Sequence, residues 1–99
     1  MPFIIDPAGE EIKMLKRAVA FRDKRVLEIG CGEGRLTLRL ASLGPQRIDA
    51  LDPDPARLRT ARRTLPARLK DVVHYAVGQA ERLRQSDGAY DIVVFSWSL

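Results

Sequence analysis

Three glycines at alternate positions, Gly30, Gly32 and Gly34, directly follow a short apolar run over residues 26–29. That run is too short for a globular helix and is bounded by turn residues, so it predicts a buried strand. Glycine adopts positive φ readily and lets a ligand approach the main chain without a Cβ atom in the way. A mostly apolar helical pattern over 36–43 comes next, and a Gly-Pro pair ends it. The glycine loop therefore lies at the carboxyl end of a predicted parallel strand, where nucleotide-like ligands bind.

An alternating stretch over 47–51 predicts a second strand. This strand ends at Asp52, eighteen residues beyond Gly34. A carboxylate at the tip of the second strand can accept hydrogen bonds from both hydroxyls of a ribose. A dinucleotide fold is the rival interpretation, but its fingerprint places glycines at relative positions 1, 3 and 6. The sixth position here is Arg35, and the third glycine comes one residue early. This spacing disfavours NAD binding.

An acidic residue, Glu28, stands two positions before the first glycine. The combination resembles the first motif of class I S-adenosylmethionine-dependent methyltransferases, in which an acidic residue precedes the pattern GxGxG. Two later segments are similar to further motifs of that family: residues 78–83 to the motif after strand three, and residues 90–99 to the fourth strand and its loop. The resemblance covers nearly the whole chain. It implies S-adenosylmethionine as the cofactor and methyl transfer as the activity.

The resemblance also implies roles for residues near the first two strands. Glu28 would lie near the methionine portion of the cofactor, or else hold the glycine loop by backbone hydrogen bonds. The glycines would lie beneath the methionine portion, or else form a tight turn without a ligand. Asp52 would bind the ribose, or else simply end its strand before a proline; Asp54 is better explained as a helix cap than as an adenine contact. The implied cofactor-binding residues are Glu28, Gly30, Cys31, Gly32, Gly34, Asp52, Pro53, Gln79, Ala80 and Ser96.

The later motifs concern the adenine and the methyl acceptor. By resemblance, Gln79 contacts the exocyclic amine of the adenine, and the N–H of Ala80 meets a ring nitrogen. Gln79 stands where an acidic residue is usual, so this contact lacks charge assistance, and the alternative is an ordinary surface residue. Ser96 would lie near the cofactor, while Trp97 would line the acceptor pocket or pack in the core. The closest resemblance is to methyltransferases of small molecules, which share no fixed catalytic base, so no catalytic residue is assigned.

The composition and charge of the chain argue against several kinds of partner and site. The chain has 99 residues, a formal net charge of +4 and one cysteine, Cys31, so an intrachain disulfide is excluded. The arginines are dispersed among acidic residues without interleaved aromatics, so we do not expect nucleic acid as the substrate. No long apolar run or secretory leader is present, so we expect no membrane segment and a cytoplasmic location. His74 has no partner histidine, so no metal is expected, and nothing near Cys31 marks it as a nucleophile.

The remaining pattern predicts an α/β fold. Further elements are expected as helices over 7–21 and 55–65, a short helix near 80–84, and strands over 72–76 and 90–95. Strands that alternate with helices imply a parallel sheet with right-handed crossovers, here in the order 3-2-1-4. By resemblance this is a Rossmann-like three-layer sandwich, truncated from the family's seven-stranded sheet. Residues 1–99 would then form an incomplete class I methyltransferase domain, its cofactor-binding half.

The expected sheet leaves the strand over 90–95 at an edge. An apolar unpaired edge is a pairing liability, so we expect either a truncated product or a second copy or partner chain that pairs there. Two other functions stay open beside a methyltransferase with a small-molecule acceptor. One is a non-catalytic nucleoside-binding remnant or partner module, and the other is a dinucleotide-binding oxidoreductase fragment.

Overall fold

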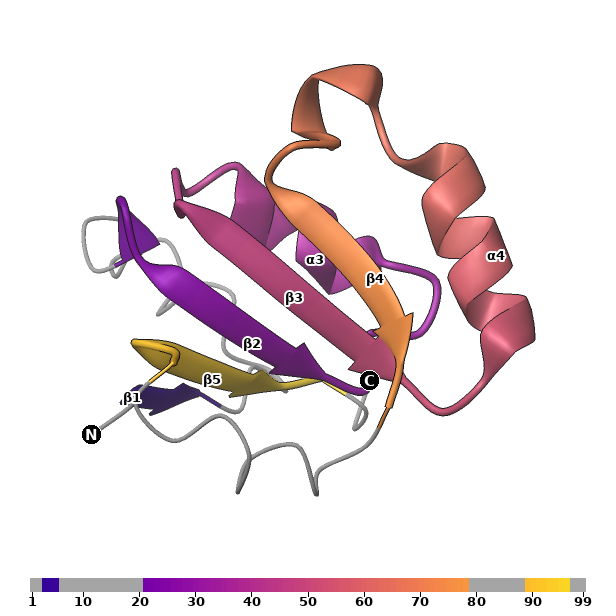
Figure 1. Cartoon of the computed structure of the whole chain (residues 1–99), viewed down its shortest axis with the longest axis horizontal. Helices are drawn as coiled ribbons and strands as arrows, with labels where there is room; N and C mark the ends of the chain where they lie inside the picture. Colours follow the sequence, from indigo (N-terminus) through magenta and orange to yellow (C-terminus); the bar gives the residue numbers. More distant parts are fainter. Residues whose placement is uncertain (1–2, 6–20, 79–88, 97–99) are drawn as a thin grey trace.

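The structure is a computed structural model that describes residues 3–5, 21–78 and 89–96. Within these residues the strands form one five-stranded sheet in the order β1-β5-β2-β3-β4 (Figure 1). Each neighbouring pair of strands is parallel. The elements are β1 (Phe3–Ile5), β2 (Arg25–Ile29), α3 (Arg35–Ala41), β3 (Arg47–Asp52), α4 (Pro55–Thr64), a 3₁₀ turn η1 (Ala67–Leu69), β4 (Val73–Val77) and β5 (Ile92–Phe95).

Four of these strands confirm the predicted α/β fold and the strand order 3-2-1-4, which corresponds to β4-β3-β2-β5. The register aligns Ile29 with Leu51 and Asp52 with Val77. Because all these strands are parallel, the carboxyl ends of β2, β3 and β4 lie along one edge of the sheet, as Figure 1 shows. The glycine loop and the tip of the second strand therefore start from neighbouring positions.

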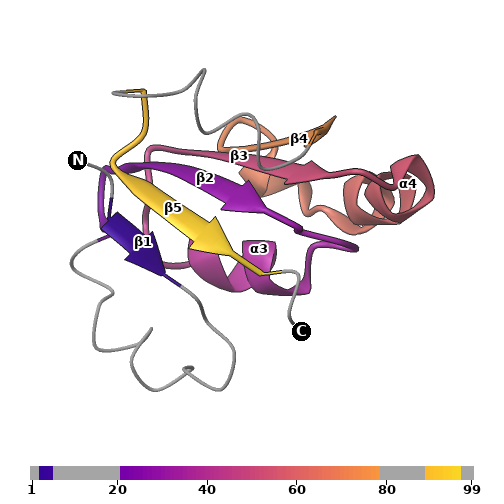
Figure 2. The same cartoon turned by 90° about the horizontal axis from the view of Figure 1, so that it is seen from below.

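The prediction of an unpaired edge along the strand over 90–95 is wrong. β1 pairs with β5 in parallel, with Phe3 aligned with Ile92 and Ile5 with Val94. In Figure 2, β1 lies beside β5 at the end of the sheet opposite β4. Three apolar residues show too little periodicity to predict a strand, so β1 could not be expected from the sequence. The edge expected to pair with a second copy or a partner chain is covered by this chain's own first strand.

The helix that follows β3 starts as its sequence predicts. Asp54 caps α4, because its Oδ1 accepts a hydrogen bond from the Ala56 N–H at 2.9 Å, and Pro55 is the first helical residue. The helix ends at Thr64, one residue early, because Leu65 precedes a proline and takes extended backbone.

The other predicted elements differ from the structure by small shifts or lie outside it. α3 covers 35–41 instead of 36–43, and β4 starts one residue later than expected. The helices expected over 7–21 and near 80–84 lie outside the described residues, apart from Phe21 at the end of the first. None of the helices in the described part of the chain is long and apolar enough to cross a membrane.

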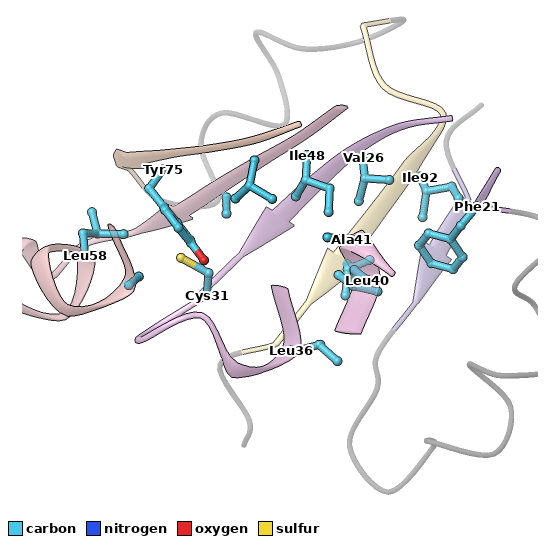
Figure 3. Close-up of a cluster of buried hydrophobic side chains, with 14 residues drawn as sticks. Phe21, Val26, Cys31, Leu36, Leu40, Ala41, Ile48, Leu58, Tyr75 and Ile92 are labelled. Atoms are coloured by element: carbon cyan, nitrogen blue, oxygen red, sulfur yellow. The ribbon is translucent and has the colours of Figure 1, made fainter. Parts of the chain in front are cut away.

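Strands β2, β3 and β5 are largely buried on both faces, as is usual in a parallel sheet. α3 and α4 pack on one face through a cluster of side chains that Figure 3 shows, including Leu40 from α3, Leu58 from α4 and Ile48 from β3. The opposite face has a smaller cluster, whose buried members are Leu27, Ile29, Leu51 and Val93. Together these two clusters hold the strand ends, and with them the glycine loop, in fixed positions.

Candidate functional site

The glycine loop over residues 30–34 joins β2 to α3 and is fixed to the neighbouring strand. The N–H groups of Gly30 and Cys31 both donate to the carbonyl of Leu51, at 2.8 and 3.0 Å. The three glycines have φ values of +80°, +58° and +89°, which confirms the predicted positive φ. A Cβ atom at Gly32 would have no neighbour within 4 Å, so the main chain there borders open space. A ligand can approach the loop from that side.

Asp52, at the end of β3, lies directly against this loop. Its Oδ2 accepts a hydrogen bond from the N–H of Gly32 at 2.9 Å, and its Oδ1 accepts one from the N–H of Asp54 at 2.9 Å. The residue is only 4% exposed. Each carboxylate oxygen has a second lone pair, so these two bonds leave acceptor capacity for a ligand hydroxyl. The two parts of the sequence signal therefore meet at one place.

Glu28 lies beneath the loop and is fully buried. Thr37 Oγ1 donates to its Oε1 at 2.5 Å, and Ser96 Oγ donates to its Oε2 at 2.8 Å. Burial raises the pKa of Glu28 to about 7, although the two hydrogen bonds to the carboxylate oppose the rise. Glu28 thus connects surrounding elements through side-chain hydroxyls, where the sequence suggested backbone hydrogen bonds as the alternative to a cofactor contact. The cofactor contact itself stays a prediction.

Ser96 joins three parts of the site. Its N–H donates to the carbonyl of Ile29 at 2.9 Å, which continues the pairing of β5 with β2. Its Oγ lies 2.8 Å from Glu28 Oε2 and 3.0 Å from the carbonyl oxygen of Gly30. The structure therefore brings Ser96 to the buried side of the glycine loop, among the residues that the sequence grouped with it.

Cys31 directs its side chain into the core, toward the hydroxyl end of Tyr75 (Figure 3). Burial raises the pKa of its thiol, and the negative charges of Glu28 and Asp52 raise it further. A thiol in this state is not a nucleophile at neutral pH, so the side chain has a packing role. Only the main chain of Cys31 remains for the predicted cofactor contact.

The other predicted site residues divide into two groups. Pro53 is exposed directly after Asp52, at the same end of the sheet. Gln79, Ala80 and Trp97 lie outside the described residues, so their adenine and acceptor roles stay predictions.

Sequence reasoning missed two polar residues beneath the loop, Thr37 and Tyr75. Thr37 is completely buried, and Tyr75 places its hydroxyl so close to Gly34 that a Cβ atom there would overlap it. Among the described residues, the buried hydroxyl of Tyr75 has no hydrogen-bond partner. The burial of Thr37 could have been predicted, because it shares helical spacing with the buried Leu40 and Ala41.

Within the described part of the chain, no three or more side chains of His, Cys, Asp or Glu are grouped to hold a metal ion. The ring of His74 instead lies beside the main chain, with Nε2 3.2 Å from the carbonyl oxygen of Asp71. The polar groups of the site are therefore carboxyls, hydroxyls and loop amides.

The arrangement fits a nucleoside that carries an amino-acid tail. Asp52 has acceptor capacity for ribose hydroxyls, and the open main chain at Gly32 lies next to it. S-Adenosylmethionine is such a molecule: we expect its methionine portion along the glycine loop and its ribose at Asp52. When bound, this cofactor supplies a methyl group that its sulfonium already activates for transfer.

Comparisons with known proteins agree with this fit. The family described as "Methyltransferase domain" matches residues 26–99. A protein N5-glutamine methyltransferase of Methanocaldococcus jannaschii is 28% identical over 95 residues, which cover 96% of this chain and 47% of that protein. A malonyl-[acyl-carrier protein] O-methyltransferase of Geobacter sulfurreducens is 37% identical over 93 residues, covering 89% of this chain and 34% of that protein. The chain thus spans less than half the length of these curated relatives.

A solved structure extends the likeness to the fold. The S-adenosylmethionine-dependent methyltransferase from Listeria monocytogenes superposes with a TM-score of 0.71 at 28% identity, covering 89% of this chain and 38% of that one. Residues 26–99, which the methyltransferase family matches, include the glycine loop, Asp52 and β5, the parts that build the site. This chain therefore belongs to the family of methyltransferase domains whose cofactor is S-adenosylmethionine.

Proposed function

We propose that residues 1–99 form the S-adenosylmethionine-binding half of a class I methyltransferase. In this role the glycine loop receives the methionine portion of the cofactor, and Asp52 accepts hydrogen bonds from the ribose hydroxyls. Gly30, Gly32 and Gly34 contribute main-chain groups, together with the main chain of Cys31. Pro53, Gln79 and Ala80 border the adenine. Ser96 and Glu28 support the loop from below.

One observation carries this proposal more than any other: the hydrogen bond from Gly32 N–H to Asp52 Oδ2. It places a carboxylate with spare acceptor capacity beside a main chain that open space borders. Arg35, at the position where a dinucleotide fingerprint has its third glycine, supports S-adenosylmethionine over NAD.

Titration calorimetry with S-adenosylmethionine, S-adenosylhomocysteine and NAD tests the proposal on the whole chain. We expect heat from the first two ligands and none from NAD. A thermal shift should agree, because a ligand that binds only the native state raises the melting temperature, and the rise grows with the ratio of ligand concentration to Kd. Binding of NAD alone would support the dinucleotide alternative and contradict the proposal.

The acceptor is a separate question with two candidate classes. The sequence predicts a small molecule, whereas the names of the two curated relatives refer to a protein glutamine and an acyl-carrier protein. These names favour a methyl acceptor that a protein carries. Labelled methyl from S-adenosylmethionine, followed into the protein and small-molecule fractions of an extract, separates the two classes.

The same labelling experiment addresses catalysis. We expect the isolated chain to bind cofactor without transferring methyl, because the acceptor site of the family draws on the part of the domain that this chain does not match. Transfer to either fraction by this chain alone would show that residues 1–99 suffice. Binding without transfer, also in a chain extended to the relatives' length, would favour the non-catalytic nucleoside-binding module.

A further inference from the structure

The hydroxyl of Ser96 has one proton and a choice of acceptors. Its Oγ lies 2.8 Å from Glu28 Oε2, 3.0 Å from the carbonyl oxygen of Gly30 and 3.4 Å from that of Ile29. A serine hydroxyl donates one hydrogen bond and accepts up to two. Ser96 can therefore satisfy either the carboxyl beneath the loop or the first carbonyl of the loop, but it cannot donate fully to both.

The protonation state of Glu28 decides which acceptor receives the proton. When Glu28 is ionised, both its oxygens only accept, so Thr37 and Ser96 donate to them and Gly30 loses the Ser96 proton. When Glu28 carries a proton on Oε2, it donates to Ser96 Oγ, and Ser96 turns its own proton to the Gly30 carbonyl. In the protonated state the Gly30 carbonyl therefore also receives a hydrogen bond, and no heavy atom has to move.

We propose that Ser96 is a positioning residue that relays the protonation state of Glu28 to the carbonyl of Gly30 and so sets how firmly the glycine loop is held. The consequence for cofactor binding rests on the function proposed above, whereas the relay itself is a property of the free protein. A loop that is held before the ligand arrives binds with a smaller ordering cost. The protonated state is therefore the state with higher cofactor affinity.

The position of Glu28 makes this relay relevant near neutral pH. Its carboxyl is fully buried, and that burial raises the pKa of Glu28 to about 7. The two other groups near Glu28 whose pKa is shifted both titrate above this range. Burial raises the pKa of the Tyr75 phenol on β4 to about 12, and the pKa of the Cys31 thiol on the loop is raised as well.

Other charged residues lie on the elements around the glycine loop. Asp52 on β3 and Arg62 on α4 interact with Cys31, and Arg62 donates to the carbonyl of Tyr75 at 2.9 Å. Glu33 and Arg35, on the loop and at the start of α3, are exposed. Of the groups beneath the loop whose pKa is shifted, Glu28 is the one with a pKa near neutrality.

Carbon-13 NMR of the free chain tests the relay directly. The carbonyl of Gly30 and the side-chain carboxyl of Glu28 are followed from about pH 5 to about pH 9, a range that spans the expected midpoint. In the native protein we expect both resonances to titrate with the same midpoint. In Ser96→Ala, the carboxyl of Glu28 should still titrate while the response of the Gly30 carbonyl is lost.

Two further variants keep the test decisive where Ser96→Ala is poorly folded. Ser96→Thr keeps the hydroxyl and should restore the Gly30 response. Glu28→Gln cannot titrate and should remove it. A Gly30 carbonyl that titrates equally in Ser96→Ala would overturn the relay, because the effect would then reach the loop through space without Ser96. A Gly30 carbonyl that does not respond in the native protein would overturn it as well.

Affinity for S-adenosylhomocysteine provides the functional readout. We expect roughly three- to tenfold tighter binding at about pH 6 than at about pH 8, which is the range for one hydrogen bond. Ser96→Ala should lose this pH dependence, and Ser96→Thr should keep it. Absence of binding at any pH would contradict the proposed function alone, since the carbonyl titration in the free protein still decides the relay.

Discussion

The N–H of Gly32 donates a hydrogen bond to Asp52 Oδ2 at 2.9 Å, across twenty positions of the sequence. A second bond, from the N–H of Asp54 to Oδ1, fixes the same carboxylate from the side of α4. Asp52 therefore belongs to the structure of the glycine loop before any ligand arrives. A residue that shapes the loop and, in the function proposed above, also binds the ribose should affect cofactor binding more than a surface contact does.

Replacement of Asp52 tests this relationship. We expect Asp52→Ala to weaken binding of S-adenosylhomocysteine by about 1 kcal/mol or more, because charge-assisted hydrogen bonds to the ribose are lost. The loop amide of Gly32 also loses its acceptor. Titration calorimetry of both proteins at one pH measures the difference.

Asp54→Ala is the matched control, since Asp54 lies two positions away and its side chain caps α4. We expect it to lower the free energy of unfolding by about 1 kcal/mol through the lost cap. Cofactor affinity should stay near the native value. If the two variants bind equally well, Asp52 has no special place in the site.

The parts of this site that the sequence predicted follow from local rules. Gly30, Gly32 and Gly34 were identified because positive φ is a property of the residue itself. Asp52 was identified because a strand pattern ends there, and Asp54 because a cap followed by proline starts a helix. Parallel pairing then brings strand ends together without further information.

The parts that it did not predict depend on packing between distant segments. Thr37 is nine positions from Glu28, and Ser96 is 68 positions from it, so no local pattern shows that both hydroxyls reach one carboxyl. β1 is three residues long, and it can be recognised as a strand only through its pairing with β5. Tyr75 shows the alternation of an ordinary strand, and its closeness to Gly34 is visible only in the fold.

The burial of Glu28 predicts a pH dependence of stability. Its pKa is about 7 in the folded chain against an ordinary value of 4.5, so the folded state binds the proton more tightly than the unfolded state. Stability should therefore be highest below about pH 4.5 for this group, fall as pH rises to about 7, and stay level above that. The loss is on the order of 3 kcal/mol. Urea denaturation across this range measures it.

Glu28→Gln isolates this contribution, because the amide has a similar shape and does not titrate. The variant should lose the decline between about pH 4.5 and about pH 7. A decline of the same size in Glu28→Gln would assign the effect to another group.

Asp91 should act in the opposite direction at lower pH. Its pKa is lowered, first by the hydrogen bond from the Arg25 N–H at 2.9 Å and then by the guanidinium of the same residue. A lowered carboxyl pKa gives stability that is present above the unfolded pKa and lost as pH falls through the folded pKa. Asp91→Asn should therefore flatten the acid side of the stability profile, with a small effect at neutral pH because the pair is exposed. An unchanged acid limb in this variant would assign that limb to other carboxyls.

The closeness of Gly34 and Tyr75 predicts coupled mutations. Gly34 has φ +89°, and a Cβ atom there would overlap the Tyr75 hydroxyl, so Gly34→Ala meets both backbone strain and a clash. We expect it to lower the free energy of unfolding by about 2–4 kcal/mol. Tyr75→Phe alone should change stability by less than about 1 kcal/mol, because the hydroxyl has no partner among the described residues.

In the Tyr75→Phe background, Gly34→Ala should lower stability by only about 1–2 kcal/mol, the part that positive φ accounts for. The double-mutant cycle therefore gives a favourable coupling of about 1–2 kcal/mol. Chemical denaturation of the four proteins measures it. Equal effects of Gly34→Ala in both backgrounds would mean that the hydroxyl moves aside at no cost, and the requirement for glycine at position 34 would then come from its backbone angle alone.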